Sequence, residues 1–165
     1  MPILAIDPGP ERSAYVIYDA TTKTVVSHDM IANLELLSSL SDDSQKKETC
    51  MVIEAIACYG MPVGKEVFDT CIWVGRFIQA WSPGRHKYEL VYRREVKDAL
   101  CHSQRANDST IRQALLDYFG PGKDRAIGKK ANPGPLYGVH GDEWSALAVA
   151  ITYVTRHEQT SSVIA

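Results

Sequence analysis

The sequence predicts an α/β fold in which a central mixed five-stranded sheet is flanked by helices. Three observations support this prediction. Residues 3–6 and 50–53 are short apolar runs without a polar break, as expected of strands buried on both faces. Residues 14–28 contain two β-branched runs separated by a polar turn, which is typical of antiparallel strands. Segments with helical spacing separate the later strands, and this order favours parallel crossovers.

The first part of the chain is expected to form three strands and one helix. The strands cover residues 3–6, 14–18 and 24–28. Asn33 is a candidate N-cap for a helix over 34–40, because asparagine accepts hydrogen bonds from free backbone N–H groups. Leu34, Leu37 and Leu40 would share one face of that helix.

The remaining segments alternate between strands and helices. Strands are expected at 50–54 and 88–92, and helices at 65–81, 94–101, 108–119 and from about Asp142 onwards. The segments 58–64 and 120–139 are rich in glycine and proline and are expected to be loops. The first strand is expected at the centre of the sheet, because its side chains are apolar throughout.

Length and composition indicate an ordinary soluble protein. The 165 residues suffice for a single domain over 1–165 with one core. The longest apolar run, 146–154, is far shorter than the roughly 20 residues of a membrane span, and no signal peptide is evident. We therefore expect a cytoplasmic protein without membrane contact. Four cysteines without C-x-x-C spacing predict buried free thiols rather than zinc ligands or disulfides: Cys50, Cys58, Cys71 and Cys101.

Acidic residues stand where three apolar elements begin or end. Asp7 follows the first strand, Glu54 follows the run 50–53, and Asp142-Glu143 precedes an apolar helix. A carboxylate beside a core must be paired, turn-capping or bound to a cation. Asp7 also fits a simple Asp-Pro-Gly turn, and Asp142 with Glu143 also suits the positive end of a helix. One acidic site for divalent cations would account for all of these positions together.

Converging carboxylates can hold two divalent cations about 3.5–4 Å apart, which together promote phosphodiester hydrolysis. Mg²⁺ is the expected ion, with Mn²⁺ as a substitute, because the candidate ligands are hard oxygen atoms.

Three motifs resemble those of the RuvC-type Holliday junction resolvases, in particular the shorter versions of phages and prophages. They are Ile3-Leu4-Ala5-Ile6-Asp7-Pro8-Gly9, Val52-Ile53-Glu54 and Asp142-Glu143-Trp144-Ser145-Ala146-Leu147-Ala148-Val149-Ala150. The segments 94–97, 112–115 and 129–139 also resemble that branch, so the resemblance extends from Ile3 to Tyr153. Sugar kinases and chaperone ATPases share openings like the first motif, so the resemblance depends on all three in order.

The resemblance implies an RNase H-like fold, a homodimer and Mg²⁺-dependent cutting of branched DNA, with no small-molecule substrate. It assigns catalytic and metal-binding roles to Asp7, Glu54 and Asp142. A fourth acid is expected one turn after Asp142, but Ser145 occupies that position. Glu143, although about 100° away around the helix, is a candidate for the fourth ligand, and His140 is another.

Positive charge is concentrated in one part of the chain. Residues 85–130 contain eleven Lys and Arg against six Asp and Glu, although the net charge is only −2. This asymmetry favours nucleic-acid binding. The phosphate-contact candidates are Arg93, Arg94, Lys97, Arg105, Arg112, Lys123, Arg125, Lys129 and Lys130, with solvated surfaces as the alternative. Lys130, just before the acidic helix, is also a catalytic candidate beside the scissile phosphate.

Tyr59 and Met61 follow Glu54 and could stack on or wedge between bases at a junction, or pack across a dimer interface. The large apolar residues of 65–81 are expected in the core or in that interface. The main alternative function is a YqgF-like or degenerate RNase H-like protein that acts on RNA or only binds branched nucleic acid. An ATP-using kinase would need two such domains, for which 165 residues are too few.

Overall fold

The structure, a computed structural model, describes residues 1–42, 48–58, 60–81, 86–120 and 122–163. Its centre is a five-stranded sheet with the order β3-β2-β1-β4-β5. The strands are β1 (Pro2–Asp7), β2 (Arg12–Asp19), β3 (Thr24–Ala32), β4 (Cys50–Ala55) and β5 (Tyr88–Tyr92). Because β1 pairs antiparallel with β2 and parallel with β4, the sheet is mixed. The predicted fold class and the central position of the first strand are confirmed.

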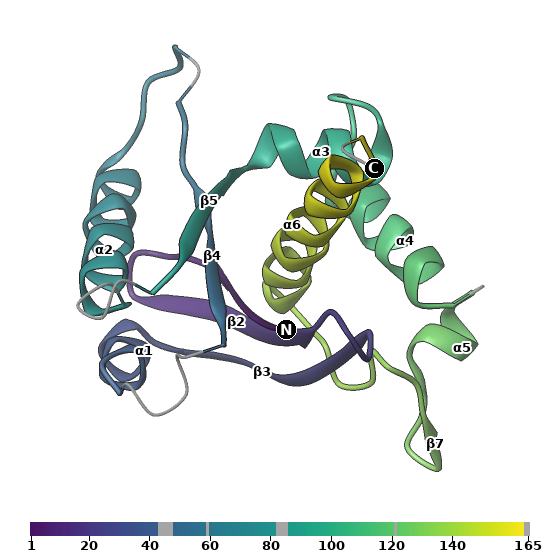
Figure 1. Cartoon of the computed structure of the whole chain (residues 1–165). Helices are drawn as coiled ribbons and strands as arrows, with labels where there is room; N and C mark the ends of the chain where they lie inside the picture. The colour runs from purple at the N-terminus through teal and green to yellow at the C-terminus, as the bar shows by residue number, and fades with distance from the viewer. Residues whose placement is uncertain (43–47, 59, 82–85, 121, 164–165) are drawn as a thin grey trace.

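Helices cover both faces of this sheet (Figure 1). One face carries α1 (Asn33–Leu40) and α2 (Lys65–Trp81), and the other carries α6 (Glu143–Val163) with α3 (Arg93–Cys101) and α4 (Asp108–Phe119) against it. Successive side chains of a strand point to opposite faces. Ile3 and Ala5 accordingly join the core under α6, whereas Leu4 and Ile6 join the core under α1 and α2. The uninterrupted apolar character of β1 follows from burial on both sides.

The helix α6 is fully buried from Ala146 to Ile151. A helix that is apolar all round must be covered on every side. The sheet covers one side, and α3 and α4 pack on others. The start of this helix is thereby fixed against the carboxyl end of β1. Among the described residues, no helix combines the length and apolar character that crossing a membrane requires.

Most predicted elements are confirmed, but the loop predicted at 120–139 is not entirely irregular. It contains the short helix α5 (Lys123–Ala126) and a hairpin of β6 (Gly128–Lys129) and β7 (Asn132–Pro133). Gly128 has φ +71° and approaches Asn132 so closely that a Cβ would lie 2.4 Å from its carbonyl oxygen. Strands of two residues leave no periodic pattern in a sequence, which is why they were not predicted.

Two predictions for α1 are wrong. Asn33 is the first helical residue rather than the N-cap, and its side chain is buried. Leu34 is 66% exposed, whereas Leu36 and Leu40 are buried. The inward hydrogen bonds of Asn33 set the rotation of the helix, so residues 33, 36 and 40 face the core.

The cysteine prediction is confirmed only in part. The four cysteines are free, and Cys50 in β4 is buried. Cys58 and Cys71 are exposed, because one lies in the loop after β4 and the other on the outer side of α2.

Candidate active site

The register of the sheet places Asp7 beside Glu54. Ile6 pairs with Ile53 across the parallel strands β1 and β4, so the next residues of the two strands are also neighbours. Ile6 and Ile53 belong to the core under α1 and α2. Asp7 and Glu54 therefore point to the opposite face, which α6 covers. Two carboxylates thus emerge side by side at the carboxyl ends of two buried strands.

The turn after Asp7 is held by polar contacts below it. Asn33 Nδ2 donates to the carbonyl oxygen of Gly9 at 2.9 Å, and Ser13 Oγ donates to Asn33 Oδ1 at 2.7 Å. The N–H of Gly9 donates to Ser13 Oγ at 3.3 Å. A Cβ on Gly9 would lie 2.4 Å from the carbonyl oxygen of Arg12, so this close approach requires glycine. These contacts fix the end of β1 and with it the position of Asp7.

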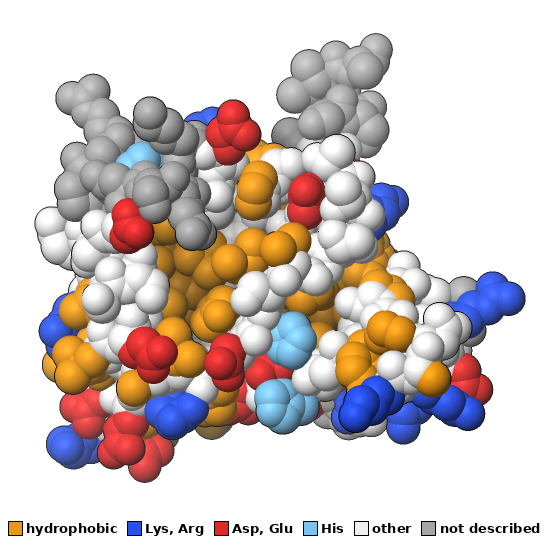
Figure 2. Space-filling view, turned by 90° about the horizontal axis from the view of Figure 1, so that it is seen from below, with side chains coloured by type: hydrophobic (Ala, Val, Ile, Leu, Met, Phe, Trp, Pro, Cys, Tyr) orange, Lys and Arg blue, Asp and Glu red, His pale blue; other side chains and the backbone are white. Residues whose placement is uncertain are grey.

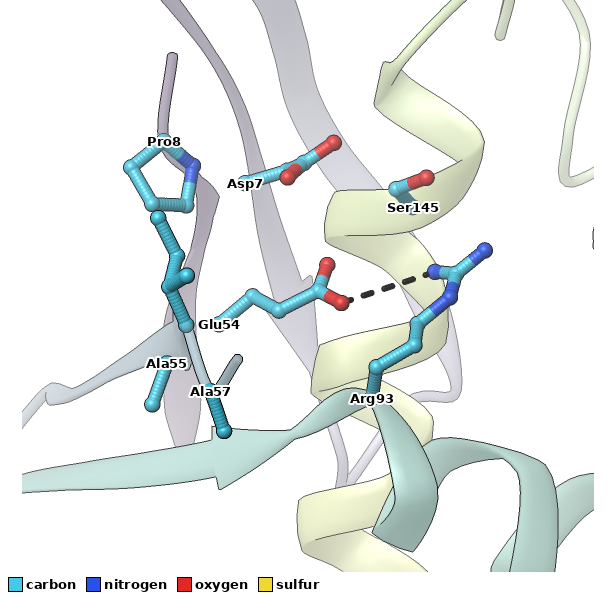
Figure 3. Close-up of a pocket in the computed structure, with 8 residues that line it drawn as sticks. Asp7, Pro8, Glu54, Ala55, Ala57, Arg93 and Ser145 are labelled. Atoms are coloured by element: carbon cyan, nitrogen blue, oxygen red, sulfur yellow. Dashed lines mark ion pairs between the residues drawn. The ribbon is translucent and has the colours of Figure 1, made fainter. Parts of the chain in front are cut away.

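Asp7 and Glu54 line a pocket of about 310 Å³ (Figure 3). The lining residues are Asp7, Pro8, Glu54, Ala55, Ile56, Ala57, Arg93 and Ser145. Arg93 Nη1 lies 3.6 Å from Glu54 Oε1, and its Nη2 also pairs with Asp108 at the start of α4. The pocket therefore combines two adjacent carboxyl groups with one guanidinium group.

The surroundings of the two carboxyl groups disfavour their ionised forms. Burial, followed by the charges of Glu54 and Asp142, raises the pKa of Asp7 to about 8, although Arg93 opposes the shift. Burial also raises the pKa of Glu54, again opposed by Arg93. At neutral pH Asp7 is therefore protonated and donates a hydrogen bond to Glu54. A cation bound between the groups would displace this proton.

The start of α6 contributes Ser145 and Asp142. Ser145 lines the pocket, and Asp142 is close enough for its charge to raise the pKa of Asp7. The structure thus places Asp7 and Glu54 in one pocket, and Asp142 acts on Asp7 through its charge without being among the residues that line this pocket. One turn after Asp142 the pocket receives a hydroxyl group instead of a fourth carboxylate.

Glu143 is not among the residues that line this pocket. Its Oε2 lies 2.8 Å from Nδ1 of both His28 and His140, where the ring N–H donates, and it accepts the backbone N–H of His140 at 2.9 Å. The Glu143 side chain is only 1% exposed. Glu143 therefore joins the start of α6 to β3, and neither it nor His140 is placed as a ligand of the pocket.

The donor set fits a hard divalent cation. Asp7, Glu54, Asp142 and Ser145 offer only oxygen atoms, which Mg²⁺ and Mn²⁺ prefer. A cation would also favour the ionised form of Asp7, which burial and then the neighbouring carboxylates disfavour. In the described part of the chain, no three His, Cys, Asp or Glu side chains already form a cluster fit to hold a metal ion. Protonation of Asp7 and the ion pair with Arg93 balance the carboxyl groups in this arrangement.

Comparison with solved structures identifies the fold. The chain is similar to the structure of Thermus thermophilus RuvC, with a TM-score of 0.70 and 14% identity over 97% of both chains. It is also similar to T. thermophilus RuvC in complex with a Holliday junction substrate, with a TM-score of 0.70 and 12% identity over 96% of both chains. The fold is RuvC-like. No protein-family model and no curated protein sequence matches the chain.

The basic candidates lead away from the acidic pocket of the RuvC-like fold. Arg94, with Ala57, Tyr92 and Glu95, lines an adjoining pocket of about 300 Å³. Further along, the half-exposed or exposed candidates are Lys97 on α3, Arg105 before α4, Arg112 on α4, and Lys129 and Lys130 in the β6–β7 hairpin. Figure 2 shows Lys and Arg gathered at the end of the molecule that carries α5 and this hairpin. Lys130 is not among the described residues that line the acidic pocket.

The loop after Glu54 and the helix α2 expose apolar side chains. Met61 is 71% exposed, and Phe68 and Ile72 on α2 are 60% and 62% exposed. Phe77 and Trp81 on the same helix are buried, so of the two predicted places, core or dimer interface, they lie in the core. Tyr59 lies outside the described residues.

Sequence reasoning missed three contributions to this region. Arg93 was a candidate for DNA contact, but its ion pair with Glu54 depends on the pairing of β4 with β5. Ser13 is a polar residue at the start of an apolar strand, and that contrast was the available signal for its buried hydrogen bond. His28 meets Glu143 across 115 residues of sequence, and no local pattern indicates such a contact.

Proposed function

We propose that this protein is a divalent-cation-dependent, structure-selective endonuclease that resolves four-way (Holliday) or other branched DNA junctions. The observation behind the proposal is the adjacent pair Asp7 and Glu54, with Asp142 nearby, in a pocket of a RuvC-like fold. The protein would act as a single nuclease domain over residues 1–165 in the cytoplasm. One of the similar structures contains a Holliday junction substrate, which supports branched DNA as the ligand.

The proposed reaction is hydrolysis of a phosphodiester. A water oxygen bonds to phosphorus, one P–O ester bond breaks, and the products are a phosphomonoester and a free hydroxyl group. Asp7, Glu54 and Asp142 would hold Mg²⁺, or Mn²⁺ in its place. When bound, the cation supplies positive charge opposite the negative charge that develops on the reacting phosphate. The carboxyl groups orient the site from fixed strand ends, which suits a reaction that depends on positioning.

DNA would bind along the basic residues that extend from the pocket. Arg94 lies in the adjoining pocket, and Lys97, Arg105 and Arg112 follow along α3 and α4. Lys129 and Lys130 would contact phosphates further from the reacting bond, at the exposed hairpin. Met61 would reach bases or the partner protomer from the loop after β4. Contacts of this kind position the duplex arms without reading sequence.

We also propose a homodimer formed through α2. A four-way junction presents two equivalent strands, and a two-fold dimer presents one pocket to each. Phe68 and Ile72 lie one turn apart on the outer side of α2 and leave an apolar stripe exposed. Light scattering at micromolar concentration, with and without junction DNA, tests this proposal. A monomer mass in both conditions would contradict it.

The direct test of the function uses the purified protein with labelled four-way junction, flap and duplex DNA, in Mg²⁺ and in EDTA. We expect cutting of branched DNA in Mg²⁺, little cutting of duplex, and none in EDTA. Absence of cutting on every branched substrate in Mg²⁺ and Mn²⁺ would contradict the proposal.

One observation favours a second function. Ser145 replaces the fourth carboxylate, and this departure suits a YqgF-like or degenerate protein that acts on RNA or only binds branched nucleic acid. The two functions differ in a single measurement. Tight junction binding without cation-dependent cutting of DNA would favour the second.

A further inference from the structure

The acidic pocket contains one arginine, Arg93, next to the carboxyl group of Glu54. Arg93 is the single Lys or Arg among the described residues that line it. Its guanidinium group lies on the α6 side of Glu54, near Ser145 (Figure 3). Nη1 is 3.6 Å from Glu54 Oε1, and the Glu54 side chain is only 13% exposed. This contact is therefore shielded from solvent more than a typical surface ion pair.

The position of Arg93 is set by the sheet. Glu54 pairs with Val91 and Ala55 pairs with Tyr92 across β4 and β5, so Arg93 follows directly beyond the paired strands. The N–H of Tyr92 donates to Glu95 Oε2 at 2.7 Å, which fixes the start of α3. Asp108 holds the guanidinium group from the other side. The arginine is thus a fixed part of the pocket and not a surface side chain that happens to reach it.

The charges of the pocket are balanced by one divalent cation. Asp7, Glu54 and Asp142, when ionised, contribute three negative charges, and Arg93 contributes one positive charge. Asp108 is 89% exposed at the rim, so water screens its charge. In the absence of DNA, one divalent cation would bring the charge of these four groups to zero. A second cation near the guanidinium group would be repelled by it.

The α6 side of the pocket gives no support for a second cation. The residue that α6 turns into the pocket beyond Asp142 is Ser145, whose hydroxyl is neutral. Glu143 Oε2 is occupied by His28 and His140, and although its Oε1 is buried without a hydrogen-bond partner, Glu143 is not among the residues that line the pocket. Arg93 and Ser145 line the same pocket, so a positive charge is already present there.

We propose that Arg93 supplies the second positive charge of this site: the pocket binds one divalent cation, and Arg93 contacts the scissile phosphate directly. This inference rests on the proposed nuclease function and replaces the expected pair of cations by one cation and one arginine. An arginine suits this role because its planar N–H groups can donate to two oxygens of one phosphate. Glu54 and Asp108 would hold it ready until DNA arrives.

The test counts cations and measures cutting on the full-length protein. Mn²⁺ binding is measured by electron paramagnetic resonance and calorimetry on wild type and on Asp7→Asn, and the difference gives the ions bound in the pocket. We expect a difference of one Mn²⁺ per chain, and a difference of two would overturn the proposal. This readout does not depend on activity.

Cutting of a four-way junction is then compared in three variants at saturating Mn²⁺. We expect Arg93→Gln to cut about 10²–10³-fold more slowly, as for loss of one charged donor at a reacting centre. Arg93→Lys, which keeps the charge, should recover part of the rate. Arg156→Gln is the matched control, because Arg156 also pairs with two carboxylates, Glu89 and Glu95, but lies outside the pocket. The cutting rate of Arg156→Gln should lie within about threefold of the wild-type rate.

Circular dichroism establishes that each variant is folded. If Arg93→Gln is unfolded, the Arg93→Lys rate and the wild-type Mn²⁺ count decide the question. Cutting by folded Arg93→Gln at the rate of wild type would overturn the inference while leaving the nuclease function intact. A wild-type protein that neither cuts branched DNA nor binds Mn²⁺ through Asp7 would overturn the proposed function itself.

Discussion

Two groups of carboxylates lie near the start of α6: Glu143 on one side, and Asp7 with Glu54 in the pocket. They differ in how the protein balances their negative charge. Glu143 Oε2 receives hydrogen bonds from the rings of His28 and His140 and from a backbone N–H. Asp7 and Glu54 instead face each other, and one arginine 3.6 Å from Glu54 offsets only part of their charge. In the first arrangement Oε2 is satisfied within the protein, although Oε1 of Glu143 is buried without a hydrogen-bond partner. In the second, burial favours a protonated Asp7, and a bound cation would replace that proton.

The comparison separates a carboxylate that joins two segments of the fold from the pair that we propose as cation ligands. Burial alone does not distinguish them, because Glu143 is more deeply buried, at 1% exposure, than Glu54, at 13%. The distinguishing feature is the raised pKa of Asp7, which is caused first by burial and then by the charges of Glu54 and Asp142. Proximity of an acid to the predicted site therefore does not make it a ligand.

The largest expected effect on cutting is that of Asp7→Asn, which removes a proposed ligand of the cation. Loss of a metal ligand should remove about 4 kcal/mol of transition-state stabilisation, or roughly 10³-fold in cutting rate. Junction binding should remain within a few-fold. In EDTA the variant should also be more stable than wild type at pH 8, because asparagine avoids the cost of ionising a buried carboxyl group beside Glu54 and Asp142. Nuclease assays, gel shifts and thermal melts measure these three effects, and an unchanged cutting rate would remove Asp7 from the site.

Substitution of Glu143 should have the opposite effect on stability. Glu143→Ala leaves the N–H groups of His28 and His140 without an acceptor, at a cost of about 1–3 kcal/mol of stability. At roughly 2–4 °C per kcal/mol, Tm should fall by several degrees. Glu143→Gln is the milder control, since its amide oxygen can still accept. If Glu143→Ala kept its Tm but lost pocket Mn²⁺ as Asp7→Asn does, Glu143 would be a ligand and the comparison would fail.

Stability in EDTA should fall as pH rises. The pKa of Asp7 lies at about 8 in the folded protein, far above its ordinary value of 3.8. Between these values the unfolded chain releases the proton while the folded protein keeps it, so the free energy of unfolding decreases with pH and levels off above about pH 8. Urea midpoints from pH 5 to 9 measure the trend. Asp7→Asn should lack this component, and saturating Mg²⁺ should reduce it by displacing the proton.

The placement of Asp7 and Glu54 in one site was predictable because it depends on the local sequence pattern. Each ends a short apolar strand, and strand alternation then places both on one face of the sheet. Helix boundaries at 65–81 and 108–119 were predictable for the same reason, since apolar spacing and punctuating residues lie within each segment.

The remaining features depend on contacts between distant segments. His28 joins Glu143, and Asn33 turns inward to Gly9 rather than capping its helix. Sequence propensity describes what Asn33 favours in isolation, but the tertiary hydrogen bonds to the turn after Asp7 override it. Arg93 likewise reaches Glu54 only because β4 and β5 are neighbours in the sheet.

The smallest expected effect on cutting is that of replacing Lys129 and Lys130. Neither residue lines the pocket of Asp7 and Glu54 or contacts Glu143. Their exposed side chains belong to the hairpin and would contact phosphates away from the reacting bond. Replacing both with Gln should flatten the slope of log affinity against log salt by up to about 2, because each phosphate contact releases about one counterion. At saturating protein the cutting rate should stay within a few-fold of wild type. Lys23→Asn, in the β2–β3 turn, is the control and should leave the slope unchanged. A large loss of cutting at saturation would instead place Lys130 at the scissile phosphate, and the pocket would then contain a second basic group beside Arg93.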